Sequence, residues 1–135
     1  MRYAFLGAIL IIWGLWGFLP KLTVGLMPLR QAILFHALGG LLVGLGVAFF
    51  GGGEWPPIHW RGALMALATG IMGVGGSLLY YHLLKDGSVT VTMVLTHLYP
   101  VVTVLLAVLI LGETLTWKQG LATLFALASI TLFAL

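Results

Sequence analysis

Cysteine is absent from this sequence of 135 residues, and charged residues are scarce. Without cysteine the chain can form neither disulfides nor thiolate metal sites, and it cannot use a thiol nucleophile. Asp, Glu, Lys and Arg together make up 7% of the residues, whereas a soluble domain contains roughly 25%. So little charge cannot cover a water-facing surface, and 61% of the residues are hydrophobic. We therefore expect lipid to be the solvent of this protein.

Catalytic and ligand-binding motifs are also missing. No phosphate-binding loop and no nucleophile–base arrangement occurs at a known spacing, so we expect neither an enzyme nor a bound cofactor. The four histidines lack the spacing of a metal site, and no metal is predicted. The six Lys and Arg residues are too dispersed to form the basic face that binding of nucleic acid requires.

The sequence instead contains a series of long apolar segments. A helix needs about 20 apolar residues to cross the hydrocarbon core, and five segments qualify, near residues 3–19, 32–50, 62–84, 88–111 and 118–135. They are continuously apolar rather than alternating, which argues against membrane-spanning strands. The first follows Arg2 as a signal peptide would, but it is long enough to span the membrane and no A-x-A cleavage site follows it. We predict an all-α integral membrane protein with one domain, 1–135, of five transmembrane helices.

Turn-forming and capping residues mark the predicted helix ends. Pro20 is expected to end the first helix, and Pro28 to begin the second at its first position. Ser88 is a suitable N-cap for the fourth helix. Thr116 and Gln119 form a predicted capping box ahead of the fifth helix, because each side chain can pair with the backbone N–H of the other residue.

Small residues form a stripe along the third predicted helix: Gly62, Ala66, Gly70, Gly73 and Ser77. In lipid the hydrophobic effect does not join helices, so small residues that permit close approach are what allows them to pack. We expect this stripe to pack against other helices within one subunit.

The positive charges do not select an orientation in the membrane. Five helices place the N-terminus, the second loop and the fourth loop on one side, and the other loops and the C-terminus on the other. The two sides hold three Lys or Arg residues each: Arg2, Arg61 and Lys118 against Lys21, Arg30 and Lys85. A chain without charge bias can insert both ways, so two copies in opposite orientation would form an inverted repeat. We expect an antiparallel homodimer or a paralogous partner of opposite bias; parallel and monomeric states stay open.

Several short motifs, taken together, resemble the EamA-like domain of the drug/metabolite transporter superfamily. They occur in order along the whole chain: Trp-Gly at 13–14, Leu-Arg at 29–30, the tyrosine-rich end and turn at 79–87, Leu-Tyr-Pro-Val-Val at 98–102, Leu-Gly-Glu-Thr-Leu at 111–115, and Gly120. The resemblance implies a five-helix unit. Longer members of the superfamily carry two such units as inverted repeats around a central cavity and move small metabolites, including amino acids.

By the same resemblance, this chain is one half of a 5+5 transporter and has to pair. Smaller four-helix relatives use a carboxylate in the first helix for proton-coupled efflux. Here the first acidic residue is Glu54, so that coupling mechanism does not carry over directly.

Polar residues along the predicted fourth helix recur at spacings of three and four and share one face: Ser88, Thr92, Thr96, Tyr99 and Thr103. This face either lines a water-filled cavity, or its hydroxyls bond back to carbonyls of their own helix. Aromatic side chains suit the wall of a solute cavity, through burial and cation–π attraction. We predict a substrate cavity formed by the residues Trp13, Tyr80, Thr92, Thr96, Tyr99 and Thr103.

Three further residues have predicted roles. His97 lies at mid-membrane depth and is a possible proton site, although a neutral hydrogen-bonding histidine is the alternative. Pro100 cannot donate to the carbonyl of Thr96, so it is a predicted hinge or a structural kink. Glu113 precedes the fifth helix, whose N-terminus favours an anion, and we expect a structural role for it at the helix end.

Together these patterns predict a secondary carrier or facilitator of small organic solutes in the plasma (inner) membrane of a prokaryote. A flippase for lipids or lipid-linked metabolites is one alternative. An accessory membrane subunit without a pathway of its own is the other.

Overall fold

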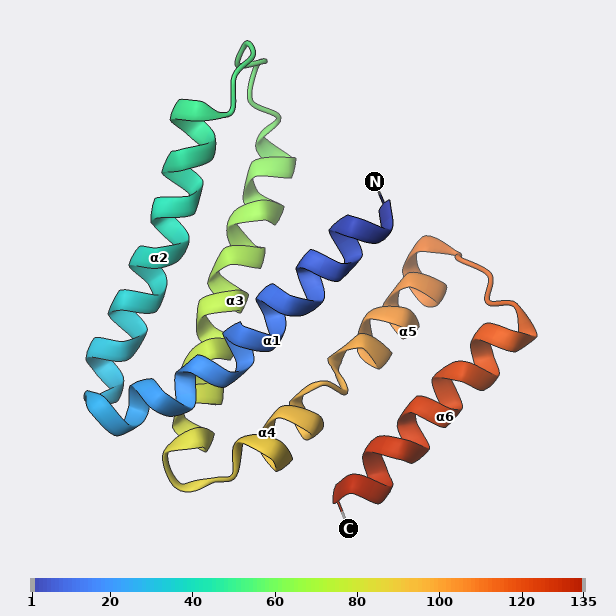
Figure 1. Cartoon of the computed structure of the whole chain (residues 1–135). Helices are drawn as coiled ribbons and strands as arrows, with labels where there is room; N and C mark the ends of the chain where they lie inside the picture. The colour runs from blue at the N-terminus through green and yellow to red at the C-terminus, as the bar shows by residue number, and fades with distance from the viewer. Residues whose placement is uncertain (1, 135) are drawn as a thin grey trace. The chain divides into compact units, whose positions relative to one another are not determined.

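The computed structural model describes residues 2–134, and the described chain consists of helices and connecting loops without a strand (Figure 1). The six helices are α1 (Arg2–Leu26), α2 (Leu29–Phe50), α3 (Trp60–Asp86), α4 (Val89–Thr96), α5 (Tyr99–Leu111) and α6 (Trp117–Ala134). They form two compact units. Unit 1 holds α1–α3 and ends at Asp86, and unit 2 begins at Gly87 and holds α4–α6.

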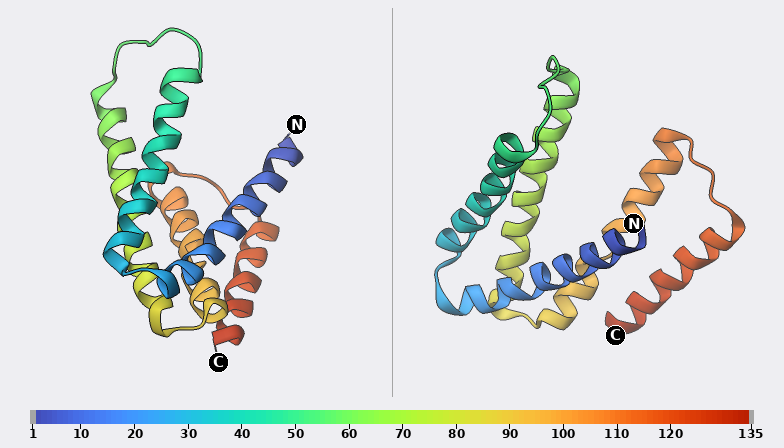
Figure 2. Two further views of the ribbon diagram at one scale, coloured as in Figure 1. Left: turned by 60° about the vertical axis from the view of Figure 1, so that its left-hand side comes forward. Right: turned by 45° about the horizontal axis from the view of Figure 1, so that its top comes forward.

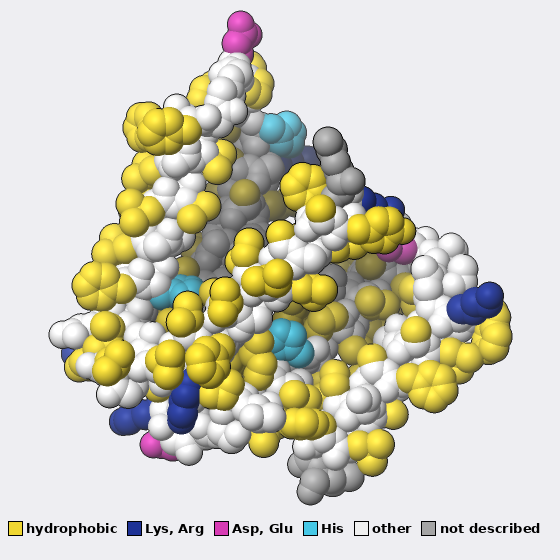
Figure 3. All heavy atoms as spheres, viewed as in Figure 1, with side chains coloured by type: hydrophobic (Ala, Val, Ile, Leu, Met, Phe, Trp, Pro, Cys, Tyr) yellow, Lys and Arg dark blue, Asp and Glu magenta, His cyan; other side chains and the backbone are white. Residues whose placement is uncertain are grey.

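Four helical stretches of the described chain are long and apolar enough to cross a membrane: Arg2–Leu26, Leu29–Phe50, Trp60–Asp86 and Val89–Leu111. The last stretch combines α4 and α5. On the face shown in Figure 3, hydrophobic side chains cover the helices, and charged side chains lie near helix ends. These features agree with the predicted all-α membrane protein.

Helix α1 extends beyond its predicted end near residue 19. It continues through Pro20 to Leu26, and Pro20 itself is buried. A proline inside a helix leaves one carbonyl without its helical partner, but membrane helices tolerate this where neighbouring groups pack around it. A hydrogen bond to α3 anchors this extension, because the Lys21 Nζ donates to the carbonyl of Leu84 at 2.7 Å.

Helices α2 and α3 lie side by side in unit 1 and run in opposite directions, joined by the loop 51–59 (Figure 2). Pro28 precedes α2 as its N-cap, with an extended ψ of 146°, rather than occupying the predicted first helical position. Gly52 and Gly53 have φ values of 64° and 89°, conformations that glycine adopts without steric cost. Helix α3 exceeds the predicted 62–84 by two residues at each end.

The buried residues of the described chain gather in unit 1, toward the C-terminal ends of α1 and α3: Gly17, Pro20, Ala32, Ser77, Tyr80, Tyr81 and Leu84. The expected packing of the small-residue stripe on α3 is found only at this end. Ser77 is buried and donates to the carbonyl of Gly73 at 2.8 Å. At Gly70 and Gly73, no described atom beyond the neighbouring backbone of α3 itself lies within 4 Å of where a Cβ would be. Most of the stripe therefore stays open to another surface.

Unit 2 differs from the prediction because the fourth apolar segment is not one continuous helix. It breaks at His97 and Leu98 into α4 and α5. Two hydrogen bonds across the break reach three residues back instead of four, from the Leu98 N–H to the Leu95 carbonyl and from the Val101 N–H to the Leu98 carbonyl. Pro100 lies in the first turn of α5, where its missing N–H breaks no helical bond. Proline is thus accommodated by starting a new helix.

Both ends of the remaining loop carry recognisable caps. Gly112 ends α5 with φ 68° and ψ 22°, in the left-handed region. The capping box before α6 is confirmed: Thr116 N–H donates to Gln119 Oε1 at 2.8 Å, and Gln119 N–H donates to Thr116 Oγ1 at 3.4 Å. Ser88 is the N-cap of α4, as predicted, but its side chain makes no capping hydrogen bond.

Candidate functional site

The threonines of the predicted cavity face lie on both sides of the helix break in unit 2. The Thr96 hydroxyl donates to the carbonyls of Thr92 at 2.8 Å and Met93 at 3.1 Å, and the Thr103 hydroxyl donates to the Tyr99 carbonyl at 3.3 Å. This is the back-bonding that the sequence left as an alternative. A hydroxyl that donates its hydrogen keeps lone pairs that accept. Thr96 and Thr103 can therefore still accept hydrogen bonds from a solute.

His97 lies within the break, and its ring is held by one hydrogen bond. Its Nδ1 lies 2.7 Å from the carbonyl oxygen of Met93. A carbonyl only accepts, so Nδ1 carries the hydrogen, and Nε2 of the neutral ring is the acceptor. The Tyr99 ring lies 5.9 Å from the His97 ring, tilted by 55°. This geometry leaves Nε2 as the ring nitrogen of His97 that can accept a hydrogen bond.

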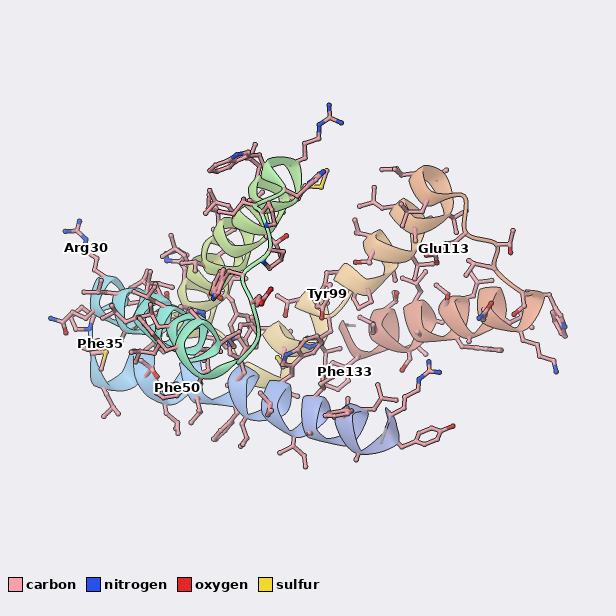
Figure 4. All side chains as sticks on the ribbon, turned by 90° about the horizontal axis from the view of Figure 1, so that it is seen from above. Arg30, Phe35, Phe50, Tyr99, Glu113 and Phe133 are labelled. Carbon is pink, nitrogen blue, oxygen red and sulfur yellow. The ribbon has the colours of Figure 1, made fainter. Side chains whose placement is uncertain are left out.

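The ends of α4 and α5 add backbone polarity to this region. Residue 100 is a proline, so the Thr96 carbonyl has no helical N–H partner four residues ahead. Helix C-termini carry partial negative charge and N-termini partial positive charge. Tyr99, at the start of α5, is 51% exposed (labelled in Figure 4). Polar groups thus concentrate near the middle of an otherwise apolar stretch of 23 residues.

Unit 1 contains an aromatic cluster formed by Trp16, His36, Tyr80 and Tyr81. The Trp16 and Tyr80 rings stack at 5.9 Å with an interplanar angle of 12°, and His36 meets the edge of Tyr81 at 5.9 Å. The Tyr80 hydroxyl donates to the Gly17 carbonyl at 2.7 Å, and Tyr80 is 5% exposed. The cluster joins α1, α2 and α3 through side chains.

Of the predicted cavity residues, Trp13 and Tyr80 belong to unit 1 and the other four to unit 2. Tyr80 stacks on Trp16, and Trp13 is 56% exposed. The pairing of Trp16 with Tyr80 carries no signal in the sequence, because the two residues are far apart along the chain. The role of Trp13 and Tyr80 in a cavity stays a prediction.

A surface cavity of about 390 Å³ in unit 1 was not predicted. Its wall consists of residues from the end of α1, the start of α2 and the end of α3: Val24, Met27, Pro28, Leu29, Tyr81, His82 and Lys85. The one sequence signal that could have identified it is the spacing of His82 and Lys85. Residues three apart share a helix face, and these two place polar groups beside apolar helix ends.

Glu113 and the histidines are the residues of this chain suited to binding an anion-favouring helix end or a metal ion. Glu113 is exposed in the loop after α5, and its N–H donates to the Ala107 carbonyl at 3.2 Å. Within residues 2–134, no three His, Asp or Glu side chains are close enough to hold a metal ion together.

No curated protein and no solved structure matches this chain significantly. The sequence model of the EamA-like transporter family matches residues 2–135, nearly the full length. Members of this family are membrane transporters of the drug/metabolite kind, and the apolar helices described above fit such a role. The chain is an integral membrane protein and belongs to the EamA-like transporter family.

Proposed function

We propose that the chain is one half of a dimeric secondary carrier or facilitator that moves a small organic solute across the plasma (inner) membrane of a prokaryote. The observation that carries this proposal is the broken helix of unit 2, which concentrates Thr96, His97 and Tyr99 in the middle of an apolar stretch. Discontinuous helices near the bilayer midplane form the substrate and ion sites of many transporters. Irregular backbone at that depth is tolerated where it is buried in protein or lines a water-filled cavity.

Helix α6 supplies the fifth membrane span of the proposal. It has 18 residues, which at 1.5 Å per residue extend about 27 Å, close to the thickness of the hydrocarbon core. Its apolar part begins after Lys118 and Gln119, two polar residues suited to the membrane surface.

Pairing with a second chain is supported by the exposed helix surfaces of this one. The described residues of α4 and α5 include none that is buried, and Gly70 and Gly73 of α3 have no neighbour across them. A second protein surface would cover such positions. The charge tie favours a second copy in opposite orientation, which completes an inverted repeat, and a paralogous partner is the alternative.

The chemistry of the site favours a solute that donates hydrogen bonds and carries apolar or aromatic parts. Thr96 and Thr103 retain acceptor lone pairs, and Tyr99 presents a hydroxyl and an aromatic face. No Asp or Glu lies within α4 or α5 to bind a cation or to couple protons. In this proposal His97 takes that second role, with Nε2 as the proton acceptor.

Solute flux into proteoliposomes tests the site. Tyr99→Phe and Thr96→Val should each lower flux about fivefold, the effect of one lost hydrogen bond of about 1 kcal/mol. Thr90→Val is the matched control, because Thr90 is an exposed threonine of α4 outside the predicted face. If both site variants transport like Thr90→Val, the assignment of the cavity is wrong.

The same vesicles separate the alternatives. Counterflow of solute supports a carrier, scrambling of labelled lipid supports a flippase, and neither activity supports an accessory subunit. Topology mapping of both termini tests the dimer separately. Each terminus should be found on both sides of the membrane, and a single fixed orientation would contradict the antiparallel homodimer.

A further inference from the structure

The cavity in unit 1, here called the interfacial pocket, lies where three helix ends meet. Val24 and Met27 come from the last turn of α1 and the residue after it, and Pro28 and Leu29 from the start of α2. These side chains make most of the wall apolar. The volume of about 390 Å³ falls in the range of roughly 300–1,000 Å³ that is typical of small-molecule sites.

The third side of the interfacial pocket is polar. Tyr81, His82 and Lys85 line it from the last two turns of α3. His82 and Lys85 are exposed and lie one turn apart on the same helix face. The pocket therefore joins an apolar wall to a cationic rim.

Positive charge prevails at this end of unit 1. Lys21 lies here because its ammonium donates to the Leu84 carbonyl, and Arg30 follows in the first turn of α2. Lys21, Arg30 and Lys85 are three cations near these helix ends, compared with one acid, Asp86. Figure 4 shows Arg30 extending away from the ribbon of α2, and Lys21 is engaged with α3. Lys85 is thus the cation that lines the pocket itself.

We propose that the interfacial pocket binds an anionic phospholipid, with an acyl chain along Val24, Met27 and Leu29 and the headgroup phosphate at Lys85 and His82. The pocket lies at the ends of three membrane-length helices, where lipid headgroups meet the acyl region. Basic pockets between membrane helices recognise anionic headgroups by charge. A soluble anion would leave the apolar wall uncovered, so the lining favours a lipid.

This inference is independent of the transport proposal, because every residue of the pocket belongs to unit 1, whereas the broken helix belongs to unit 2. A lipid bound here would occupy the junction of α1, α2 and α3. It would tie the ends of three helices together next to the aromatic cluster.

Native mass spectrometry of the purified full chain tests the proposal, with phosphatidylglycerol and phosphatidylcholine of identical acyl chains as probes. The wild-type protein should retain phosphatidylglycerol in preference to phosphatidylcholine. Lys85→Gln should weaken retention of phosphatidylglycerol about fivefold, the size expected for one lysine at an anionic membrane surface. Lys118→Gln is the matched control, since Lys118 is an exposed lysine at a helix end in the other unit.

Two further arms separate the causes. Met27→Trp fills the apolar wall without changing charge and should weaken retention of phosphatidylglycerol as well, while circular dichroism confirms that the helices are kept. Millimolar inorganic phosphate should leave the lipid in place. Equal retention of the two lipids, equal effects of Lys85→Gln and Lys118→Gln, wild-type retention by Met27→Trp, or displacement by phosphate would each overturn the proposal.

Discussion

Unit 1 and unit 2 differ in the side-chain hydrogen bonds that each contains. In unit 1 the side chains bond across helices: the hydroxyl of Tyr80 reaches Gly17, and the ammonium of Lys21 reaches Leu84, each over 63 residues of sequence. In unit 2 the side-chain hydrogen bonds described above for Thr96, His97 and Thr103 reach three or four residues back along the chain. Unit 1 therefore positions its helices through its own side chains, whereas the polar groups of unit 2 are held locally.

This difference separates stability from function. Long-range bonds in a buried cluster fix the packing of α1, α2 and α3, so substitutions there should cost stability. Local bonds fix the orientation of a side chain without joining helices. We expect the surface around the break to bind a solute or a partner, so substitutions there should cost transport instead.

The largest effect is expected at Tyr80. Tyr80→Ala removes a buried ring that stacks on Trp16 and leaves a cavity. We expect a loss of about 3 kcal/mol of stability, the cost of deleting a buried aromatic side chain, measured by thermal unfolding in detergent. Tyr99→Ala is the control, because Tyr99 is 51% exposed, and it should change unfolding little. Equal losses in the two variants would erase the distinction between the units.

The next largest effect concerns the break itself. Pro100→Ala restores a backbone N–H that can pair with the Thr96 carbonyl, which favours one continuous helix over α4 and α5. We expect solute flux to fall about tenfold, equivalent to about 1.4 kcal/mol in the barrier, with no loss of thermal stability. Pro28→Ala, at the N-cap of α2, is the control. Wild-type flux in Pro100→Ala would show that the break serves only to accommodate proline.

The helices could be predicted from the sequence because membrane-spanning helices follow from long apolar segments alone. The capping box at Thr116 and Gln119 was equally accessible, since both partners lie within one turn. The continuation of α1 through Pro20 could not be predicted from the sequence. It depends on neighbouring groups such as Leu84, whose carbonyl binds Lys21, and no local pattern reveals that contact.

The candidate site likewise contains features that the sequence reveals and contacts that it does not. The spacing of Thr92, Thr96, Tyr99 and Thr103 and the position of Pro100 beside the break could be recognised in the sequence, because these residues are close together along the chain, while their roles stay predictions. The aromatic cluster and the interfacial pocket could not, because Trp16, Tyr80 and Met27 meet their partners across helices. Hydropathy located the long apolar segments, but it revealed neither the break between α4 and α5 nor which helix faces touch.

A smaller effect distinguishes the two roles of tyrosine. Tyr80→Phe keeps the stacked ring and removes the hydroxyl that donates to the Gly17 carbonyl at 2.7 Å. We expect a loss of about 1 kcal/mol of stability with unchanged flux, the reverse of the result for Tyr99→Phe. Paired unfolding and flux measurements on both variants check this. Reduced flux at full stability in Tyr80→Phe would instead place its hydroxyl in the solute pathway.

The smallest predicted effect compares one lysine from each unit. Lys21 donates to the last turn of α3, where a cation is favourable, whereas Lys118 lies in the first turn of α6, where a cation is unfavourable. Lys21→Met should therefore cost about 0.5 kcal/mol in thermal unfolding, while Lys118→Met should leave stability unchanged or slightly raised. Salt should affect Lys21 less than an exposed ion pair, because Lys21 is half-buried. If both variants shift unfolding in the same direction, the bond between Lys21 and Leu84 does not anchor α1 to α3.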